Sequence, residues 1–333
     1  MTNILITGGA GYIGSVLTNK LIKQGVNVTV LDLMLYGENV FNTTPSLDGK
    51  LSVIKGDIRD KSLLKHLLRD IDAIVHLACI SNDPSFELNP SLGKSINFDS
   101  MEPLVSIAAN QGVKRFIYAS SSSVYGIQEI DQVTENVELK PLTDYSKYKA
   151  LCEEILLKKT SESFTTTIVR PATVSGLSSR QRLDVIVNIL TNHAFHRRRM
   201  DIFGGEQRRP NIHIDDMTDL YISLLDMPEK RINGKIYNWG NENYKVNEIA
   251  SIVKKIVGQD VITNLTHSDD LRSYSICSEK IKKELKLKPQ KTLEDAVSDL
   301  VSAFKMKLFP NSLTDKRYFN IKTMQEAKQG QYE

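Results

Sequence analysis

This sequence contains few cysteines and no long apolar run. The first absence argues against disulfide-rich and zinc-ribbon proteins, and the second against membrane-spanning proteins. The three cysteines, Cys79, Cys152 and Cys277, lie far apart and form no CxxC pair, so neither a disulfide framework nor a zinc ribbon is expected. No stretch reaches the roughly 18 apolar residues of a membrane span, and no signal peptide is evident before Gly8. We therefore expect a cytoplasmic protein with no membrane partner.

An excess of charge of one sign is also lacking. Lys and Arg number 43 against 40 Asp and Glu, a formal net charge of +3. Residues 304–333 carry six basic and three acidic side chains, so residues 1–303 balance at 37 of each. With no overall basic field, nucleic acid is not an expected partner.

What the sequence does have is an alternation of short apolar runs and helical periods. In the first half the apolar runs are continuous, as in strands covered on both faces. This order predicts an α/β fold, a Rossmann-type doubly wound parallel sheet over residues 1–172. Strands are expected at 3–7, 27–31, 51–55, 73–77, 115–120 and 165–170, and helices at 12–24, 60–70, 91–111 and 144–160.

The second half of the chain is less regular. No low-complexity linker separates it from the first half, so residues 173–305 are predicted to form a smaller C-terminal lobe interleaved with the first domain. Residues 306–333 form a tail with no chemistry assigned. Helices are expected near 184–196, 216–226, 246–257, 278–284 and 292–307, and strands near 200–203, 211–214 and 235–239.

A glycine-rich turn joins the first expected strand to the first expected helix. Gly8, Gly11 and Gly14 have the spacing GxxGxxG, which lets the backbone approach a pyrophosphate at the N-terminus of a helix. A turn without a ligand is the alternative, but the position between strand and helix is the one that a dinucleotide fold requires. We expect Tyr12 and Ile13 to contact the dinucleotide as well.

The end of the second strand indicates which dinucleotide would bind. Asp32 lies 18 residues beyond Gly14, where a carboxylate can accept hydrogen bonds from both ribose hydroxyls of the adenosine and repels a 2′-phosphate. No basic residue lies between Asp32 and Glu38. Both observations favour NAD over NADP as the cofactor.

Two further strand ends would complete the cofactor site. Asp57 and Ile58 follow the third strand, at the expected adenine edge, although an exposed turn is the alternative for Asp57. Leu77 and Ala78 end the fourth strand, and the small Ala78 would let the cofactor pass close to the backbone. His76 is expected to be a packed polar core residue.

Tyr145 and Lys149 are four residues apart and so share one face of an expected helix. The ammonium, with the positive charge of a nicotinamide, would lower the pKa of Tyr145. Tyr145 could then take a proton from a carbinol while hydride leaves for the nicotinamide, and Lys149 would donate to the nicotinamide ribose. A surface pair is the alternative. The serine-rich run 120–126 ends the fifth strand, where doubly wound sheets bind ligands, and could supply a hydroxyl to the same oxygen.

Together these motifs resemble the extended short-chain dehydrogenase/reductases that act on nucleotide sugars, the NAD-dependent epimerase/dehydratase family. The resemblance extends to about residue 305 and rests also on Asn97 and on Arg170-Pro171. It implies that Ser121 is the catalytic hydroxyl and that Asn97 supports the site from the fourth helix. It further implies that helices 91–111 and 144–160 pair across the interface of a homodimer.

The resemblance also narrows the chemistry. The family's dehydratases place Asp-Glu directly after the catalytic threonine, and Ser122-Ser123 stands there instead, which disfavours 4,6-dehydration. NAD-dependent oxidoreduction at C4 of a nucleoside-diphosphate sugar remains, as 4-epimerisation, 4-dehydrogenation or reduction of a 4-keto sugar. Segments 170–188 and 208–216 look more like a branch that includes a GDP-heptose C4 dehydrogenase. The epimerases carry a diphosphate-contacting asparagine where Thr173 falls.

Arginines are the expected ligands of the substrate's diphosphate, because it needs bidentate donors. Arg182, Arg209 and Arg272 are the candidates, and the last two fall where the family's phosphate-binding arginines lie. For each of them, a surface or ion-pair arginine is the alternative. Ser122 and Thr173 complete the expected substrate contacts.

Metal binding is not indicated by the residues. His193 and His213 are not accompanied by further metal ligands, so no metal is expected. An NAD-sensing regulator without catalysis is an alternative of another class. Such a protein could lose Tyr145 and Lys149, and this chain keeps both.

Overall fold

The computed structural model describes residues 2–38, 40–41, 49–128, 130, 132–267 and 273–327. Within them, the main sheet has seven strands in the order β10-β6-β5-β4-β1-β2-β3, and all neighbouring strands are parallel. This is the doubly wound sheet that the sequence predicts. The strands are β1 (Asn3–Thr7), β2 (Asn27–Asp32), β3 (Leu51–Lys55), β4 (Ala73–His76), β5 (Arg115–Ala119), β6 (Thr165–Pro171) and β10 (Lys235–Trp239).

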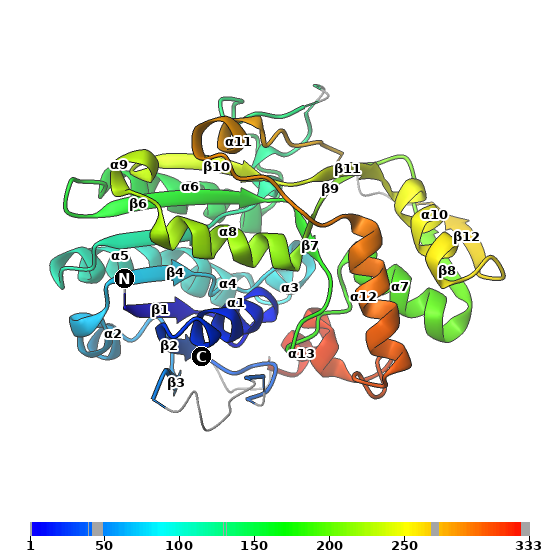
Figure 1. The fold of residues 1–333 in the computed structure, drawn as a ribbon, viewed down its shortest axis with the longest axis horizontal. Helices are drawn as coiled ribbons and strands as arrows, with labels where there is room; N and C mark the ends of the chain where they lie inside the picture. The colour runs from blue at the N-terminus through cyan, green and yellow to red at the C-terminus, as the bar shows by residue number, and fades with distance from the viewer. Residues whose placement is uncertain are drawn as a thin grey trace.

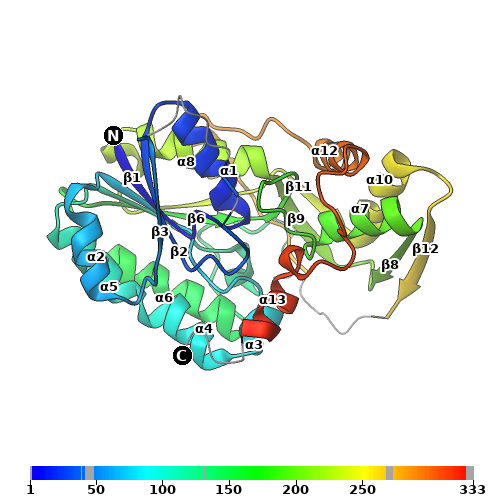
Figure 2. The ribbon, with the colours of Figure 1, turned by 90° about the horizontal axis from the view of Figure 1, so that it is seen from below.

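Helices cover both faces of the sheet, which explains its continuous apolar strands. α1 and α8 pack side by side on one face, and α2, α5 and α6 lie on the other (Figure 1 and Figure 2). Among the described residues, no helix is long and apolar enough to cross a membrane. The bounds are α1 (Tyr12–Lys23), α2 (Lys61–Leu67), α5 (Met101–Asn110), α6 (Asp144–Lys158) and α8 (Ile214–Asp226).

The C-terminal lobe, at the right of Figure 1, has small sheets and a core of its own. β10 follows much of this lobe in the sequence yet forms an edge of the main sheet beside β6, so the two parts of the chain are interleaved. Its sheets are β11 (Glu242–Lys245), β9 (Arg208–His213) and β7 (Thr173–Ser175), and β12 (Ile262–Thr266) with β8 (Arg199–Phe203). Its helices are α7 (Ile186–Arg197), α10 (Val246–Val257) and α12 (Leu293–Lys305). Two short helices of the same half of the chain, α9 (Glu229–Ile232) and α11 (Glu279–Leu285), pack instead on β6 and β10 of the main sheet (Figure 1).

Two predictions about helices need correction. The expected helix at 91–111 is divided into α4 (Pro90–Lys94), a π-helical turn η3 (Ser95–Asp99) and α5. The tail folds into a turn and the helix α13 (Asn320–Ala327), and Met324 is buried in the core of the first domain. The remaining short elements are η2 (Leu68–Asp70), α3 (Asp83–Glu87), η4 (Ser122–Tyr125) and η5 (Lys316–Tyr318).

Candidate functional site

A cavity of about 350 Å³ lies at the carboxyl ends of β1, β4 and β5, with walls from both parts of the chain. Doubly wound sheets bind ligands at this edge, where the strand order reverses between β1 and β4. Most residues that the sequence predicts as ligands therefore meet in one place. Those that line the cavity are Gly8, Gly11, Tyr12, Ile13, Gly14, Asp32, Ile58, Leu77, Ala78, Ser121, Ser122, Tyr145, Lys149, Thr173 and Arg182.

The glycine turn forms one wall of this cavity and leaves no room for side chains. Gly8 has a φ of +73°, and a Cβ there would lie 2.6 Å from the Ala78 nitrogen. A Cβ on Gly14 would lie 2.2 Å from the Gly8 carbonyl oxygen. Gly11 caps α1 without a side-chain hydrogen bond, so the first N–H groups of α1 can meet an anion such as a pyrophosphate.

Asp32 lies in the same wall at the end of β2. One of its carboxylate oxygens accepts the Ala10 N–H at 3.0 Å, and the other accepts the Met34 N–H at 2.8 Å. Burial raises the pKa of Asp32, while these two hydrogen bonds and the charge of Arg180 act against that rise. The backbone thus holds a carboxylate at the cavity, where it can receive ribose hydroxyls.

The first turns of α6 present Tyr145 and Lys149 to the cavity. Thr143 caps the helix with a capping box, and its hydroxyl also donates to Asp83 at 2.5 Å. Lys149 is buried one turn beyond Tyr145 and donates to the Ala119 carbonyl at 2.7 Å. Its Nζ lies 5.9 Å from the centre of the Tyr145 ring. Thr143 thus ties the start of α6 to α3 (Asp83–Glu87), and Lys149 ties the same face of the helix to β5.

The surroundings of Tyr145 favour its neutral phenol form. Burial raises its pKa well above the ordinary value, and the nearby Cys79 and Asp83 act in the same direction. Arg182 and a hydrogen bond with Ser121 lower the pKa of Tyr145. The sequence predicts this influence for Lys149, whereas the charge that lowers the pKa of Tyr145 in the structure is that of Arg182, from the C-terminal lobe.

A buried ion pair supports the serine-rich run from behind. Ser121 accepts hydrogen bonds from the backbone N–H and the hydroxyl of Ser123, at 3.1 and 2.9 Å. The preceding Ser120 donates to Glu153 of α6 at 2.5 Å. Arg170 of β6 in turn donates to Glu153 at 2.6 and 2.9 Å. The pair therefore ties this run to the helix that carries the tyrosine.

Two of the predicted cofactor contacts lie behind the wall rather than on it. Asp57 pairs with Arg59, at 2.6 Å between Oδ2 and Nη2, and does not line the cavity. Asn97 is buried, and its amide accepts the Ile80 N–H at 2.8 Å and donates to the Ile80 carbonyl at 3.0 Å. Because Ile80 lines the cavity, Asn97 shapes the site without reaching into it.

The three predicted phosphate-binding arginines have different positions. Arg182 lines the cavity and donates to Asp184 at 2.5 Å and to the Ser81 hydroxyl at 3.3 Å. Arg209 lies on β9, where its guanidinium donates to the preceding carbonyl, and it does not line the cavity. Arg272 lies outside the described residues.

The cavity wall also includes Tyr36, Arg180 and Asn320, which the sequence analysis missed. The Arg180 guanidinium lies over the Tyr36 ring, 3.5 Å from its centre, and donates to the Asn320 amide oxygen at 2.6 Å. Asn320 belongs to the tail, a segment to which the sequence assigns no chemistry. No motif or spacing connects these three positions, and only the folded chain brings them together.

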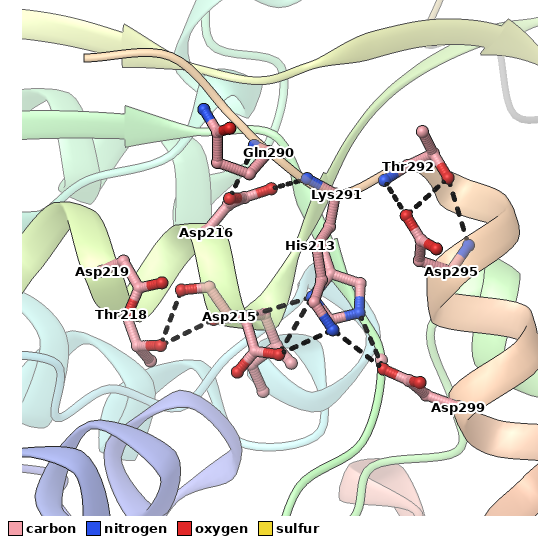
Figure 3. Close-up of polar contacts among 12 residues, drawn as sticks. His213, Asp215, Asp216, Thr218, Asp219, Gln290, Lys291, Thr292, Asp295 and Asp299 are labelled. Atoms are coloured by element: carbon pink, nitrogen blue, oxygen red, sulfur yellow. Dashed lines mark hydrogen bonds and ion pairs between the residues drawn. The ribbon is translucent and has the colours of Figure 1, made fainter.

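A second polar cluster joins β9, α8 and α12 away from the cavity (Figure 3). His213 accepts the Asp215 N–H on Nδ1 at 3.1 Å, and its Nε2 faces Asp299 at 3.4 Å. Possible ligand atoms of the three residues lie within 4.8 Å of one another. However, Lys291 pairs with both carboxylates, at 3.2 and 3.4 Å, and a neutral ring that accepts on Nδ1 carries its proton on Nε2. The arrangement favours an ion-pair junction over a metal site.

Comparison with known proteins is consistent with this geometry. Residues 4–240 match the family described as the NAD dependent epimerase/dehydratase family. The UDP-glucose 4-epimerase of Lactobacillus helveticus is 30% identical over 277 residues, which cover 78% of this chain and 82% of that protein. The UDP-N-acetyl-alpha-D-glucosaminuronate decarboxylase of Bacillus cytotoxicus is also 30% identical over 277 residues, 79% of this chain and 80% of that one.

Solved structures share the same architecture. The structure of MoeE5 in complex with UDP-glucose and NAD has a TM-score of 0.80 and 25% sequence identity. The alignment covers 92% of this chain and 100% of MoeE5. The likeness therefore includes both the main sheet and the C-terminal lobe.

Proposed function

This chain belongs to the NAD-dependent epimerase/dehydratase family, and we propose that it carries out oxidoreduction at C4 of a nucleoside-diphosphate sugar, as a 4-epimerase or 4-dehydrogenase. As a family member it is an NAD-dependent enzyme. One observation carries the proposal. Tyr145, Lys149 and Ser121 line the same cavity as the glycine turn and Asp32, so an acid/base group and a dinucleotide site share one space.

The residues of the turn fit a bound dinucleotide. A Cβ at Gly14 would meet backbone at 2.2 Å, and this close packing brings the start of α1 to the cavity. We infer that Gly8, Gly11 and Gly14, with Tyr12 and Ile13 between them, bind the pyrophosphate through the backbone. Ile58, Leu77 and Ala78 extend this proposed site, and Asp32 receives the adenosine ribose. When bound, the nicotinamide supplies the hydride acceptor and donor.

Tyr145 is the proposed acid/base. Its Oη takes the proton of the C4 hydroxyl and later returns it. Ser121, which already shares a hydrogen bond with Tyr145, orients the same substrate oxygen. Lys149 and Arg182 supply positive charge that favours the tyrosinate. The burial that raises the pKa of Tyr145 makes such compensation necessary for proton transfer near neutral pH.

Several residues at the serine-rich end favour C4 chemistry over dehydration. Ser122 and Ser123 follow Ser121, and hydroxyl groups cannot provide the carboxyl pair that elimination across C5–C6 needs. The Ser122 hydroxyl lies 3.5 Å from that of Tyr274, and both residues line the cavity. We propose Ser122, Thr173 and Arg182 as substrate contacts. The similarity to a UDP-glucose 4-epimerase supports 4-epimerisation as the first outcome to test.

A product assay with a tyrosine variant tests the proposal. The purified protein is incubated with NAD and a panel of UDP-, GDP- and dTDP-sugars, and products are analysed by mass and by NMR at C4. Unchanged mass with inverted C4 indicates an epimerase, and a loss of two hydrogens indicates a dehydrogenase. Tyr145→Phe is expected to lower kcat by about 10²–10⁴-fold, because general acid–base catalysis is lost, while NAD binding is retained.

Tyr148→Phe is the matched control on the same helix. Tyr148 packs against Phe86 and Phe98 and does not line the cavity, so its variant is expected to keep full activity. Near-normal turnover by Tyr145→Phe would contradict the assignment of the acid/base. Absence of any product from the panel would contradict the proposed reaction.

We also infer a homodimer in the cytoplasm. The helices that the family resemblance assigns to a dimer interface are α5 and α6, which pack side by side on one face of the sheet (Figure 2). All three cysteines are free thiols, as in proteins of a reducing compartment. Light scattering of the purified protein at a monomer mass would contradict the dimer, and fractionation of cells tests the location.

A further inference from the structure

Arg180 is a buried cation that forms no ion pair within the described residues. The residue is 3% exposed, and its Nε has no hydrogen-bond partner within the described residues. Its neutral partners are the Asn320 amide oxygen and the ring of Tyr36. Burial lowers the pKa of the Arg180 guanidinium to about 10. Asp184 and Asp32 act on this charge from a distance, but neither forms an ion pair with it. A buried charge without a direct counter-ion is costly, and an anion in the cavity would supply one.

The loop that carries Arg180 is attached to the first turn of α1. Ser178 donates to the Tyr12 carbonyl at 2.7 Å, and the Arg180 N–H donates to the Ser15 hydroxyl at 3.3 Å. Farther along α1, Asn19 donates to the Ser179 hydroxyl at 3.0 Å. Arg180 is therefore held beside the helix N-terminus, which is already the favourable end for a negative charge.

We propose that Arg180, from the C-terminal lobe, binds the diphosphate of the dinucleotide cofactor, and that Asn320 positions it from the C-terminal segment. The proposal rests on the NAD site proposed above and assigns it two residues that no motif predicts. A guanidinium can form paired hydrogen bonds to phosphate oxygens. The anion would thus lie between the backbone N–H groups of α1 and a cation supplied from elsewhere in the chain.

The cofactor's diphosphate is favoured over the substrate's by the neighbours of each arginine. The charge of Arg180 lowers the pKa of Asp32, in the wall with the glycine turn. The charge of Arg182 lowers the pKa of Tyr145, in the wall where reaction would occur. Arg182 also has a carboxylate partner in Asp184, so Arg180 is the arginine whose charge is left for a ligand.

Asn320 is the residue that holds Arg180 in place. It is 2% exposed, and besides accepting from Arg180 it makes two other hydrogen bonds. Its N–H donates to Asp184 at 2.6 Å, and its amide nitrogen donates to the Ser81 hydroxyl at 2.8 Å. Asn320 therefore connects the loop after β4 with the loop that bears Arg180 and Asp184, and we class it as a positioning residue.

Nucleotide titrations with the full-length protein, stripped of bound nucleotide, test the role of Arg180. Arg180→Met is expected to weaken NAD and ADP-ribose by about 10–100-fold, the usual effect of losing a charge-assisted hydrogen bond. Adenosine, which has no phosphate, should bind with unchanged affinity. Arg199→Met removes an exposed arginine of β8 that pairs with Asp201 and should leave all affinities unchanged.

A second variant tests the proposal if Arg180→Met fails to fold. Asn320→Asp keeps the shape of the side chain and gives Arg180 an internal counter-ion. We expect a higher melting temperature of the nucleotide-free protein together with weaker binding of NAD and ADP-ribose. A merely structural role for Asn320 predicts a lower melting temperature instead. That result, with unchanged affinities, would overturn the proposal.

Other phosphate sources are separated by further titrations. If Arg180→Met weakens UDP or GDP but leaves ADP-ribose unaffected, Arg180 belongs to the substrate's diphosphate. If the loss is confined to NADP, Arg180 binds a 2′-phosphate. Each outcome, or a wild-type protein that binds no ADP-ribose, overturns the proposal. A different result would separate the two proposals. If ADP-ribose binding depends on Arg180 but no nucleotide sugar gives a product, the proposed reaction is contradicted and the role of Arg180 in cofactor binding is still supported.

Discussion

Among single residues, Glu153 and Arg170 show how buried charge supports the site from behind. Both are almost fully buried, at 2% and 3% exposed, and the charge of each is compensated by the other in an ion pair. Arg170 also donates to the Tyr125 hydroxyl at 2.9 Å, which donates to Asn238 at 2.6 Å. Since Ser120 donates to Glu153, the position of the adjacent Ser121, the proposed catalytic hydroxyl, depends on this network. Removing one partner would leave the other charge buried and unpaired.

We expect Glu153→Ala to lower the free energy of unfolding by about 3–5 kcal/mol, measured by urea denaturation, and to lower kcat. Replacing both Glu153 and Arg170 by Leu should cost less than the single change, because no charge is then left unpaired. Asp99→Ala is the control, since it removes an exposed pair with Lys94 at 2.6 Å and should cost no more than about 1 kcal/mol. Equal costs for Glu153→Ala and the control would contradict this account.

Among the elements, the unit of β1, the glycine turn and α1 depends on backbone contact. A Cβ on Gly14 would lie 2.2 Å from the Gly8 oxygen and 2.7 Å from the Gly9 Cα. These are backbone atoms, which cannot move aside without displacing the turn. Gly14 lies inside α1, where alanine would otherwise favour the helix by about 1 kcal/mol. Steric contact and helix propensity therefore oppose each other at this position.

We expect steric contact to dominate in Gly14→Ala. The variant should be destabilised by about 1–3 kcal/mol and should bind NAD at least about tenfold more weakly, because the start of α1 moves. Thermal unfolding with and without NAD measures both effects. Lys23→Ala, at the exposed end of the same helix, should match the wild type. A raised melting temperature and normal NAD binding in Gly14→Ala would contradict this account, because they would show that the turn accommodates a methyl group at position 14.

For the molecule as a whole, the C-terminal segment ties the two parts of the chain together. It leaves α12 in the C-terminal lobe and reaches α3 of the first domain (Figure 2). On the way, the Ser312 hydroxyl donates to Asn192 at 2.7 Å, and the Leu183 N–H donates to the Tyr318 carbonyl at 2.8 Å. Met324, 1% exposed, then packs into the core of the first domain. Asn320 lies between Tyr318, which bonds to the C-terminal lobe, and Met324, which packs into the first domain.

We expect Met324→Ala to loosen this segment before the rest of the molecule. A buried Met→Ala change costs about 2–5 kcal/mol, and a terminal helix can open locally without global unfolding. Limited proteolysis should then cut near 308–327 more rapidly, and NAD should bind more weakly through the loss of Asn320. Gln325→Ala, exposed on the same helix, is the control. Wild-type proteolysis and affinity in Met324→Ala would contradict a role for α13 in the site.

The features that could be predicted from the sequence are those carried by neighbouring residues. Continuous apolar runs indicate buried parallel strands, and six of the seven strands of the main sheet were recognised from such runs. The seventh, β10, was expected as a strand of the second lobe, and its pairing with β6 is seen only in the structure. The glycine spacing and the pair Tyr145 and Lys149 were found because the turn and the helix face are local. The strand β7 has only three residues, and β12 is exposed along almost its whole length, so neither carries a continuous apolar run.

The contacts between distant segments were decided by the tertiary structure. Arg209 looked suitable in sequence, yet it lies on a strand outside the cavity wall. Arg180 and Asn320 are 140 residues apart, and the sequence analysis assigned a ligand to neither. A residue's partners across the chain depend on how the lobes pack, and this packing is the physical reason why the sequence determines the cofactor turn and the tyrosine helix but not the arginine that meets them.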